Sequence, residues 1–321
     1  MIRAVVILCL VGLAAVPVRA QTGAQPTPPP VAVVAPETYQ RGIDALNAED
    51  YDRALVDFSL FILLNPTYSR AYYFRAISNL GLEDPDAALI DIDRALATQP
   101  DTPAYHAAIY LLRGQIHAQQ GMLPEAIDDY GESIAVAPTF DAHFARGRLL
   151  AFTGAVDDAL GDFDSAIALD DSNPVLFVYR GGLHVQNEDQ AAASADYLTF
   201  INLIEQQSVE GNALETGQFV TGRMEQGVVF RFPIEAEEGQ FLSAVATSAR
   251  TDAQLDPLIV IVNPDGAPVA GDDDSGRSGT ALIRNYEIPA DGTYTLLVTH
   301  SLGQSSGDVA VGIELSDEPI Q

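Results

Sequence analysis

The chain of 321 residues contains one cysteine, no tryptophan and no lysine, so all 16 of its basic residues are arginines. A single cysteine excludes a disulfide framework, a zinc finger and an iron–sulfur site, since each needs several cysteines. The arginines stand against 45 aspartates and glutamates, which gives a formal net charge of −29. This shortage of cations excludes a general nucleic-acid binder and a protein that docks on anionic lipid, because both bind through clustered positive charge. An apolar content of 47% nevertheless predicts folded domains for most of the chain.

The first twenty residues have the composition of a targeting segment. Arg3 precedes an apolar run over residues 4–16, which is followed by Pro17, Val18, Arg19 and Ala20. This order predicts a signal peptide at residues 1–20, cleaved before Gln21, and export to the periplasm or the cell exterior. The run is too short to span a bilayer, although an N-terminal membrane anchor is the alternative. Residues 21–36 hold five prolines and predict an extended linker.

Residues 37–207 contain an internal repeat of about 34 residues, and five copies can be aligned in register. Each copy has a small residue in its first half, an alanine twelve residues later and a large apolar residue four further on. The small residues are Gly42, Ala76, Gly114, Gly147 and Gly181, the alanines are Ala54, Ala88, Ala126, Ala159 and Ala193, and the large residues are Phe58, Ile92, Tyr130, Phe163 and Tyr197. The spacing predicts two antiparallel helices per copy, in which the small residue faces the alanine and the large residue fills the wider end.

This spacing and residue set resembles the tetratricopeptide repeat over about 170 residues. The resemblance implies an all-α superhelical solenoid whose concave face is lined by the first helix of each repeat. Carried over position by position, that face contains Tyr39, Ile43, Tyr73, Ile77, Leu111, Gln115, Phe144, Arg148 and Val178. The lysines and asparagines with which some members hold a free C-terminal carboxylate are missing here, so the resemblance implies a groove for an apolar or mixed peptide segment. Two alternatives are that these side chains pack between adjacent helices, or that the C-terminal domain covers them.

A second register pairs arginine with aspartate in every repeat. The residue before each small position is an arginine, and the residue before each large apolar position is an aspartate: Arg41 and Asp57, Arg75 and Asp91, Arg113 and Asp129, Arg146 and Asp162, Arg180 and Asp196. We expect these residues to form structural ion pairs between helices, because matched partners at a fixed offset neutralise each other. The alternative is a ladder of arginines that binds an anionic ligand.

After about residue 208 the helical period gives way to short alternating runs separated by turn residues. Strands are expected at 218–221, 228–234, 240–248, 258–262, 281–288, 293–299 and 309–315, so residues 208–321 predict an all-β antiparallel sandwich or jelly roll. The order of features resembles the bacterial pre-peptidase C-terminal domain over residues 216–315: Val229-Phe230-Arg231-Phe232-Pro233, Glu238-Gly239-Gln240, Leu255-Asp256-Pro257-Leu258, Asn263-Pro264-Asp265-Gly266, Asp272-Asp273-Asp274 and Asp291-Gly292-Thr293-Tyr294. That resemblance implies a role in secretion or in contact with substrate and matrix.

The densest acidic cluster is compatible with a bound calcium ion, since hard oxygen ligands suit this ion. Its residues are Asp256, Asp272, Asp273 and Asp274. A solvated acidic turn is the alternative. No other cofactor is expected.

No catalytic constellation is found in the sequence. The five histidines are scattered, none forms a His-Glu-x-x-His pair, and no Gly-x-Ser-x-Gly turn is present. We therefore expect a non-catalytic, exported scaffold that binds a protein or peptide partner in the groove of the repeats. The alternative is a matrix- or carbohydrate-binding accessory module of a secreted hydrolase system, in which the β domain does the binding.

Overall fold

The computed structural model describes residues 34–98, 100, 102–248, 255–273, 279–301 and 306–320. The predicted signal peptide and most of the predicted linker lie outside these residues, as does Asp274. The described chain divides into two compact units, with the boundary between Asp162 and Phe163.

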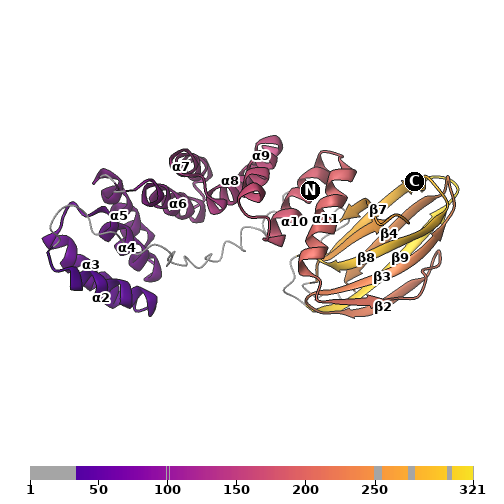
Figure 1. Ribbon diagram of the computed structural model, residues 1–321, viewed down its shortest axis with the longest axis horizontal. Coiled ribbons are helices and arrows are strands. Elements are labelled where there is room, and N and C mark those ends of the chain that lie inside the picture. Colours follow the sequence, from indigo (N-terminus) through magenta and orange to yellow (C-terminus); the bar gives the residue numbers. More distant parts are fainter. Residues whose placement is uncertain are drawn as a thin grey trace. The chain divides into compact units, whose positions relative to one another are not determined.

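Ten helices occupy the described chain before the first strand, two for each predicted repeat (Figure 1). They are α2 (Pro36–Asn47), α3 (Tyr51–Leu64), α4 (Ser69–Gly81), α5 (Pro85–Ala97), α6 (Pro103–Gln119), α7 (Leu123–Val136), α8 (Phe140–Thr153), α9 (Val156–Leu169), α10 (Pro174–Gln186) and α11 (Gln190–Ile204). Most begin at a residue suited to that place, because a side-chain oxygen at the N-cap accepts one of the free backbone N–H groups. Thus Asp50, Asp84 and Asp189 cap the second helices of their repeats, and Thr102, Thr139 and Asn173 cap first helices.

The turn between the two helices of a repeat places one residue in the left-handed region of backbone space. In the third and fourth repeats this residue is Gly121 or Gly154, with φ of 77° and 85°. In the other three repeats it is Glu49, Glu83 or Glu188, with φ between 57° and 61°. A residue with a side chain is strained in this region whereas glycine is not. The turn therefore keeps the same geometry even where its residue is a glutamate, which prefers a negative φ. The repeat as a whole therefore imposes the turn.

Glycine in the first helix makes room for the large residue of the second helix. A Cβ atom on Gly42, Gly114 or Gly181 would lie 2.6–2.8 Å from a ring carbon of Phe58, Tyr130 or Tyr197. The sequence predicted that the small residue faces the alanine, with the ring at the wider end of the pair. The structure lays the ring directly over the glycine, and the backbone carbonyl of the facing Ala126 lies 3.2 Å from the Cβ position of Gly114.

The chain from residue 207 onward forms nine strands in its described part, arranged as two sheets. The strands are β1 (Gln207–Glu210), β2 (Phe219–Met224), β3 (Val228–Ala236), β4 (Phe241–Ser248), β5 (Pro257–Val262), β6 (Pro268–Asp272), β7 (Thr280–Glu287), β8 (Gly292–His300) and β9 (Gly307–Ser316). The five-stranded sheet has the order β1-β3-β8-β5-β6 and the four-stranded sheet the order β2-β9-β4-β7. All pairings are antiparallel except that of β1 with β3. The all-β expectation is thus confirmed, with β1 and β6 added to the strands expected from the sequence.

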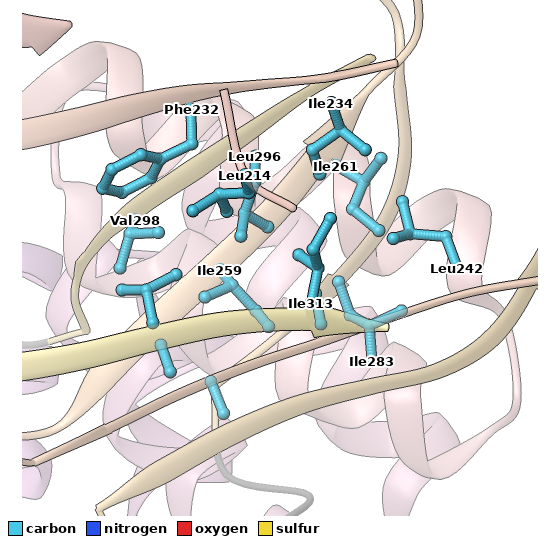
Figure 2. Close-up of a cluster of buried hydrophobic side chains, with 14 of the residues drawn as sticks. Leu214, Phe232, Ile234, Leu242, Ile259, Ile261, Ile283, Leu296, Val298 and Ile313 are labelled. Atoms are coloured by element: carbon cyan, nitrogen blue, oxygen red, sulfur yellow. The ribbon is translucent and has the colours of Figure 1, made fainter. Parts of the chain in front are cut away.

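The two sheets enclose one apolar core (Figure 2). Phe232, Ile259 and Leu296 come from the five-stranded sheet, and Leu242 and Ile313 come from the four-stranded sheet. Each is at most 8% exposed. Alternate residues of these strands point into the core, as expected for a strand with one face against its partner sheet.

The other face of the five-stranded sheet packs against α11. Tyr197, Phe200 and Ile201 of this helix form a buried cluster with Val260 of β5 and Leu297 of β8. Every residue of β5 is consequently buried, and its sequence reads Pro-Leu-Ile-Val-Ile-Val without alternation. The fifth helix pair therefore belongs to the same compact unit as the sheets, and the unit boundary lies earlier than the change of period at residue 208.

The contact between α11 and β6 depends on Gly271, where a Cβ atom would lie 2.8 Å from the ring of Tyr197 and 3.3 Å from the Cα atom of Ser194. We predict that Gly271→Val destabilises the β unit by roughly 1–3 kcal/mol, because the helix must move away from the strand. Gly182→Ala is the matched control, since its Cβ atom meets nothing closer than 3.9 Å. Urea unfolding measures both. Equal midpoints for the two variants would contradict the close approach.

Candidate functional site

The predicted groove residues all lie on first helices, and all are half-buried except Val178 of α10, which is buried. Tyr39 and Ile43 are on α2, Tyr73 and Ile77 on α4, Leu111 on α6, and Phe144 and Arg148 on α8. Positions between them, such as Gly42, Ala76 and Gly114, are buried against the second helix of the same repeat. The first helices therefore present a separate face, which we call the first-helix face and define by the seven half-buried residues named above.

Tyr39 fills the space between the first two repeats. Its ring centre lies 5.8 Å from that of Phe58, 5.0 Å from that of Phe61, 5.3 Å from that of Tyr68 and 6.1 Å from that of Phe74. Edge-to-face contacts of this kind stabilise aromatic clusters beyond simple burial. At this end of the face, the side chain contributes chiefly to packing between adjacent helices.

Tyr73 continues the aromatic cluster towards the third repeat. Its ring centre lies 6.0 Å from that of Tyr105, on α6. The guanidinium carbon of Arg70, a residue only 6% exposed, lies 3.9 Å from the centre of the Tyr105 ring. A cation over an aromatic face at this distance is attracted by the ring's negative face. Tyrosine rings and one buried arginine thus form a continuous packed cluster across the first three repeats.

Phe144 and Arg148 form the other end of the first-helix face. Both lie on α8, where the ring centre of Phe144 is 5.8 Å from that of Phe140 and the guanidinium of Arg148 is 5.5 Å above the Phe144 ring. An aromatic ring beside an arginine is a frequent anchor in protein interfaces.

Each of the five aligned arginines contacts the aspartate sixteen residues later. The shortest nitrogen–oxygen distances are 2.8 Å for Arg41–Asp57, 2.6 Å for Arg75–Asp91, 2.6 Å for Arg113–Asp129, 2.7 Å for Arg146–Asp162 and 2.6 Å for Arg180–Asp196. The aspartates are 2–5% exposed, so their carboxylates are buried between the two helices of a repeat. The hydrogen bond to Asp91 raises the pKa of Arg75, and Asp162 does the same for Arg146.

Three of these buried carboxylates contact a second polar side chain in addition to the arginine. Asn79 donates to Asp91 at 3.0 Å, while His117 and His143 contact Asp129 and Asp162 through Nδ1 at 2.8 Å. The sequence did not suggest these partners. Asn79, His117 and His184 nevertheless share one position, three residues after the small residue of the first helix. This recurrence of a polar side chain is visible in the aligned repeats and could have indicated a partner for the aspartate. Buried carboxylates need such donors because an unsatisfied charge in the interior is costly.

The acidic residues proposed for calcium have separate partners. Asp272 accepts from the backbone N–H of Leu282 at 2.7 Å, and Asp273 accepts from the hydroxyl group of Tyr197 at 2.9 Å. Asp256 accepts from the hydroxyl group of Ser301 at 2.6 Å. Among the described residues, no group of three or more histidines, cysteines, aspartates or glutamates is placed to hold a metal ion. Calcium binding, which also involves Asp274 outside the described residues, stays a prediction.

A shallow cavity of about 250 Å³ lies beside the β6 and β7 edges of the two sheets. Polar side chains line part of it, namely Gln190, Asp272, Arg284, Asn285 and Glu287.

In the part of the chain that the structure describes, no helix is both long and apolar enough to cross a membrane.

Comparison with known proteins identifies the helical part. Residues 39–103 and 111–174 match the family model described as the tetratricopeptide repeat. The predicted repeats are therefore confirmed over these residues. The resemblance of the C-terminal part to the pre-peptidase domain stays a prediction.

Solved structures give a more distant likeness, confined to about half of the chain. YrrB, described as a TPR protein with an unusual peptide-binding site, is 18% identical with a TM-score of 0.44, over 50% of this chain and 82% of that one. MamA from Desulfovibrio magneticus RS-1 is 16% identical with a TM-score of 0.48, over 54% and 97%. PilF from Pseudomonas aeruginosa is 17% identical with a TM-score of 0.47, over 54% and 77%. A comparison with curated protein sequences finds no match.

We predict that loss of a buried carboxylate is far more damaging than loss of an exposed one on the same arginine. Arg113 contacts both Asp129, whose side chain is 6% exposed, and Asp93, whose side chain is 69% exposed. Asp129→Ala should lower the free energy of unfolding by about 3 kcal/mol, because a partly buried arginine and histidine lose their partner. Asp93→Ala should cost less than about 1 kcal/mol. Denaturant titration of both variants checks the difference, and similar losses would contradict it.

A further prediction concerns alkaline pH. Burial raises the pKa of Tyr39 and of Tyr73 above the ordinary value of 10.0. Above about pH 10 the unfolded chain releases these protons while the folded chain retains them, so stability falls as the pH rises further. The chain has no lysine to titrate in the same range. Tyr39→Phe should therefore lose less stability than the unaltered protein between about pH 8 and about pH 11. Denaturant unfolding at the two pH values measures the difference. An unchanged difference between the two pH values would refute the assignment.

Proposed function

We propose that the tetratricopeptide repeats form a non-catalytic, exported scaffold that binds a protein or peptide partner on the first-helix face. The observation that carries the proposal is that four consecutive first helices each present half-buried apolar side chains on this face, with Tyr39, Tyr73 and Phe144 as its rings. Rings that are partly exposed and held by their neighbours lose little conformational freedom when a partner packs on them. Export is supported by the sequence of residues 1–20 alone.

Phe144 and Arg148 are the residues on which we expect the partner to depend most. Tyr39 and Tyr73 are held in an aromatic cluster that joins three repeats and chiefly supports the fold. Phe144 pairs its ring with Phe140 and with the guanidinium of Arg148. The Phe144 ring and the guanidinium of Arg148 above it combine apolar area with positive charge. These features suit a partner segment of mixed apolar and polar character.

The scaffold role predicts that Phe144→Ala with Arg148→Ala weakens partner binding at least about tenfold, because truncation of a central anchor removes more than about 1.4 kcal/mol. The partner is first isolated from an extracellular or periplasmic fraction with the full chain as bait, and its affinity is then measured by calorimetry. Ile90→Ala is the matched control, since this side chain is 64% exposed on a second helix. Circular dichroism confirms that each variant is folded. Equal binding by the variant and the control would overturn the proposal.

A second candidate function places the binding in the β unit, as a matrix- or carbohydrate-binding module. The cavity beside β6 and β7 favours it, since its arginine, amide and carboxylate side chains can hydrogen-bond the hydroxyl groups of a sugar. The partner's dependence on Phe144 and Arg148 separates the two candidates. Binding that instead requires Arg284 and Glu287 would support the β unit.

A further inference from the structure

The recurring geometry of the arginine–aspartate pairs includes a contact between successive repeats. In three repeats the Nη1 atom of the arginine donates to the second helix of the repeat before it. Arg75 contacts the hydroxyl group of Ser59 at 3.2 Å, Arg113 contacts Asp93 at 3.3 Å, and Arg180 contacts Asp164 at 2.6 Å. One guanidinium thus joins its own repeat to the preceding repeat.

The acceptors Ser59, Asp93 and Asp164 occupy one structural position, two residues after the buried aspartate of their repeat. In the third repeat this position is Gly131. The arginine that faces it, Arg146, uses Nε and Nη2 on Asp162 at 2.7 and 2.8 Å. In the described part of the chain, Nη1 of Arg146 has no hydrogen-bond acceptor, although the charge of Asp158, on α9, also raises the Arg146 pKa without a hydrogen bond. A Cβ atom on Gly131 would lie 3.5 Å from that nitrogen, so a side chain at this place would point at the guanidinium.

We propose that Arg146 and Gly131 form a recognition notch for an aspartate or glutamate side chain of the protein partner. The partner's carboxylate takes the place that Asp93 and Asp164 hold against Arg113 and Arg180. This inference rests on the proposed scaffold function, but the notch lies between α7 and α8 and includes no residue of the first-helix face. It is a second point of contact and sets specificity for an acidic residue.

The other pairs of the same chain show that the geometry can hold two carboxylates on one guanidinium. Arg113 contacts the buried Asp129 at 2.6 Å and the exposed Asp93 at 3.3 Å, and Arg180 contacts Asp196 and Asp164, both at 2.6 Å. The buried carboxylate fixes the guanidinium plane, so the remaining nitrogen is already oriented before a ligand arrives. Such preorganisation favours binding because little freedom remains to be lost.

The charge of the protein limits the kind of partner segment. A chain with a net charge of −29 repels a strongly acidic stretch at long range. The recognised carboxylate is therefore a single one among neutral or basic residues. Interaction with a partly exposed arginine of this kind weakens as salt increases.

The test uses the full chain labelled with ¹⁵N-arginine, because the sixteen arginines give few side-chain signals. The probes are a capped Ala-Glu-Ala peptide and its Ala-Gln-Ala counterpart, each added at constant ionic strength. We expect a saturable shift of the Arg146 guanidinium signal with the glutamate peptide and none with the glutamine peptide. Acetate serves as a second arm and reports whether a free carboxylate is sufficient.

Two variants of Gly131 separate carboxylate recognition from helix stability. Gly131→Asp supplies an internal carboxylate at the position that Asp93 holds in the preceding repeat, and should abolish the shift of Arg146. Gly131→Ala has a similar effect on the helix backbone but offers no acceptor, so the shift should remain. Asp93→Gly opens an equivalent notch in the preceding pair, and the Arg113 signal should then respond to the glutamate peptide.

The proposal is overturned if Arg146 responds equally to the two peptides, or if Gly131→Asp still shows the shift with glutamate. Absence of any Arg146 shift, with a response of Arg113 in Asp93→Gly, also overturns it, since the method then detects such a notch. Once the partner is isolated, Gly131→Asp should weaken its binding at least about threefold, whereas Gly131→Ala should not. If Phe144→Ala with Arg148→Ala leaves partner binding unchanged while Gly131→Asp weakens it, the proposed groove is refuted and the notch is supported.

Discussion

The buried aspartate of each repeat is the element on which the helical part depends. Its carboxylate lies between the two helices and accepts from an arginine sixteen residues earlier. Taking such a charge out of water is expensive, and the cost is offset only when the paired donors are correctly placed. Shifting one helix along the other by a single turn would leave the carboxylate without its donors. The pairs therefore select one alignment of the helices, while the apolar residues around them supply most of the favourable free energy.

Shape and charge restrict the same helix pair at two neighbouring places. The ring of Tyr130 lies against Gly114, and the residues just before these two are Asp129 and Arg113. Any relative movement that relieved the close contact of the ring would also break the ion pair. The first repeat has the same arrangement, with Phe58 against Gly42 and Arg41 on Asp57, and this explains why Glu49 is tolerated at a φ of 57° in its turn. Contacts along the whole pair outweigh the local strain of one residue.

Sequence periodicity indicated the helices and most strands, because both depend on burial that repeats along the chain. The strand β1 escaped notice since its four residues are mostly exposed and it pairs in parallel with β3. The strand β6 contains Gly271, which weakens the alternating signal and is needed for the approach of α11. Alignment placed arginine opposite aspartate, but only three dimensions bring Gly131 to Arg146, which belongs to the next repeat. The position of Gly131 holds Ser59, Asp93 and Asp164 in other repeats, so the sequence alone does not indicate which residue faces it.

Helix α11 has two apolar neighbours rather than one. Its Tyr197 lies against Gly181 of α10, and the same helix covers β5 and β8 of the sheet. A tandem array ordinarily lengthens by duplication of a unit at any point, because each unit meets only units like itself. Here the final unit meets a sheet as well, and a copy placed after it would have no surface to join. We therefore expect a repeat to be gained or lost only at positions before α10, with the last helix pair kept together with the β unit.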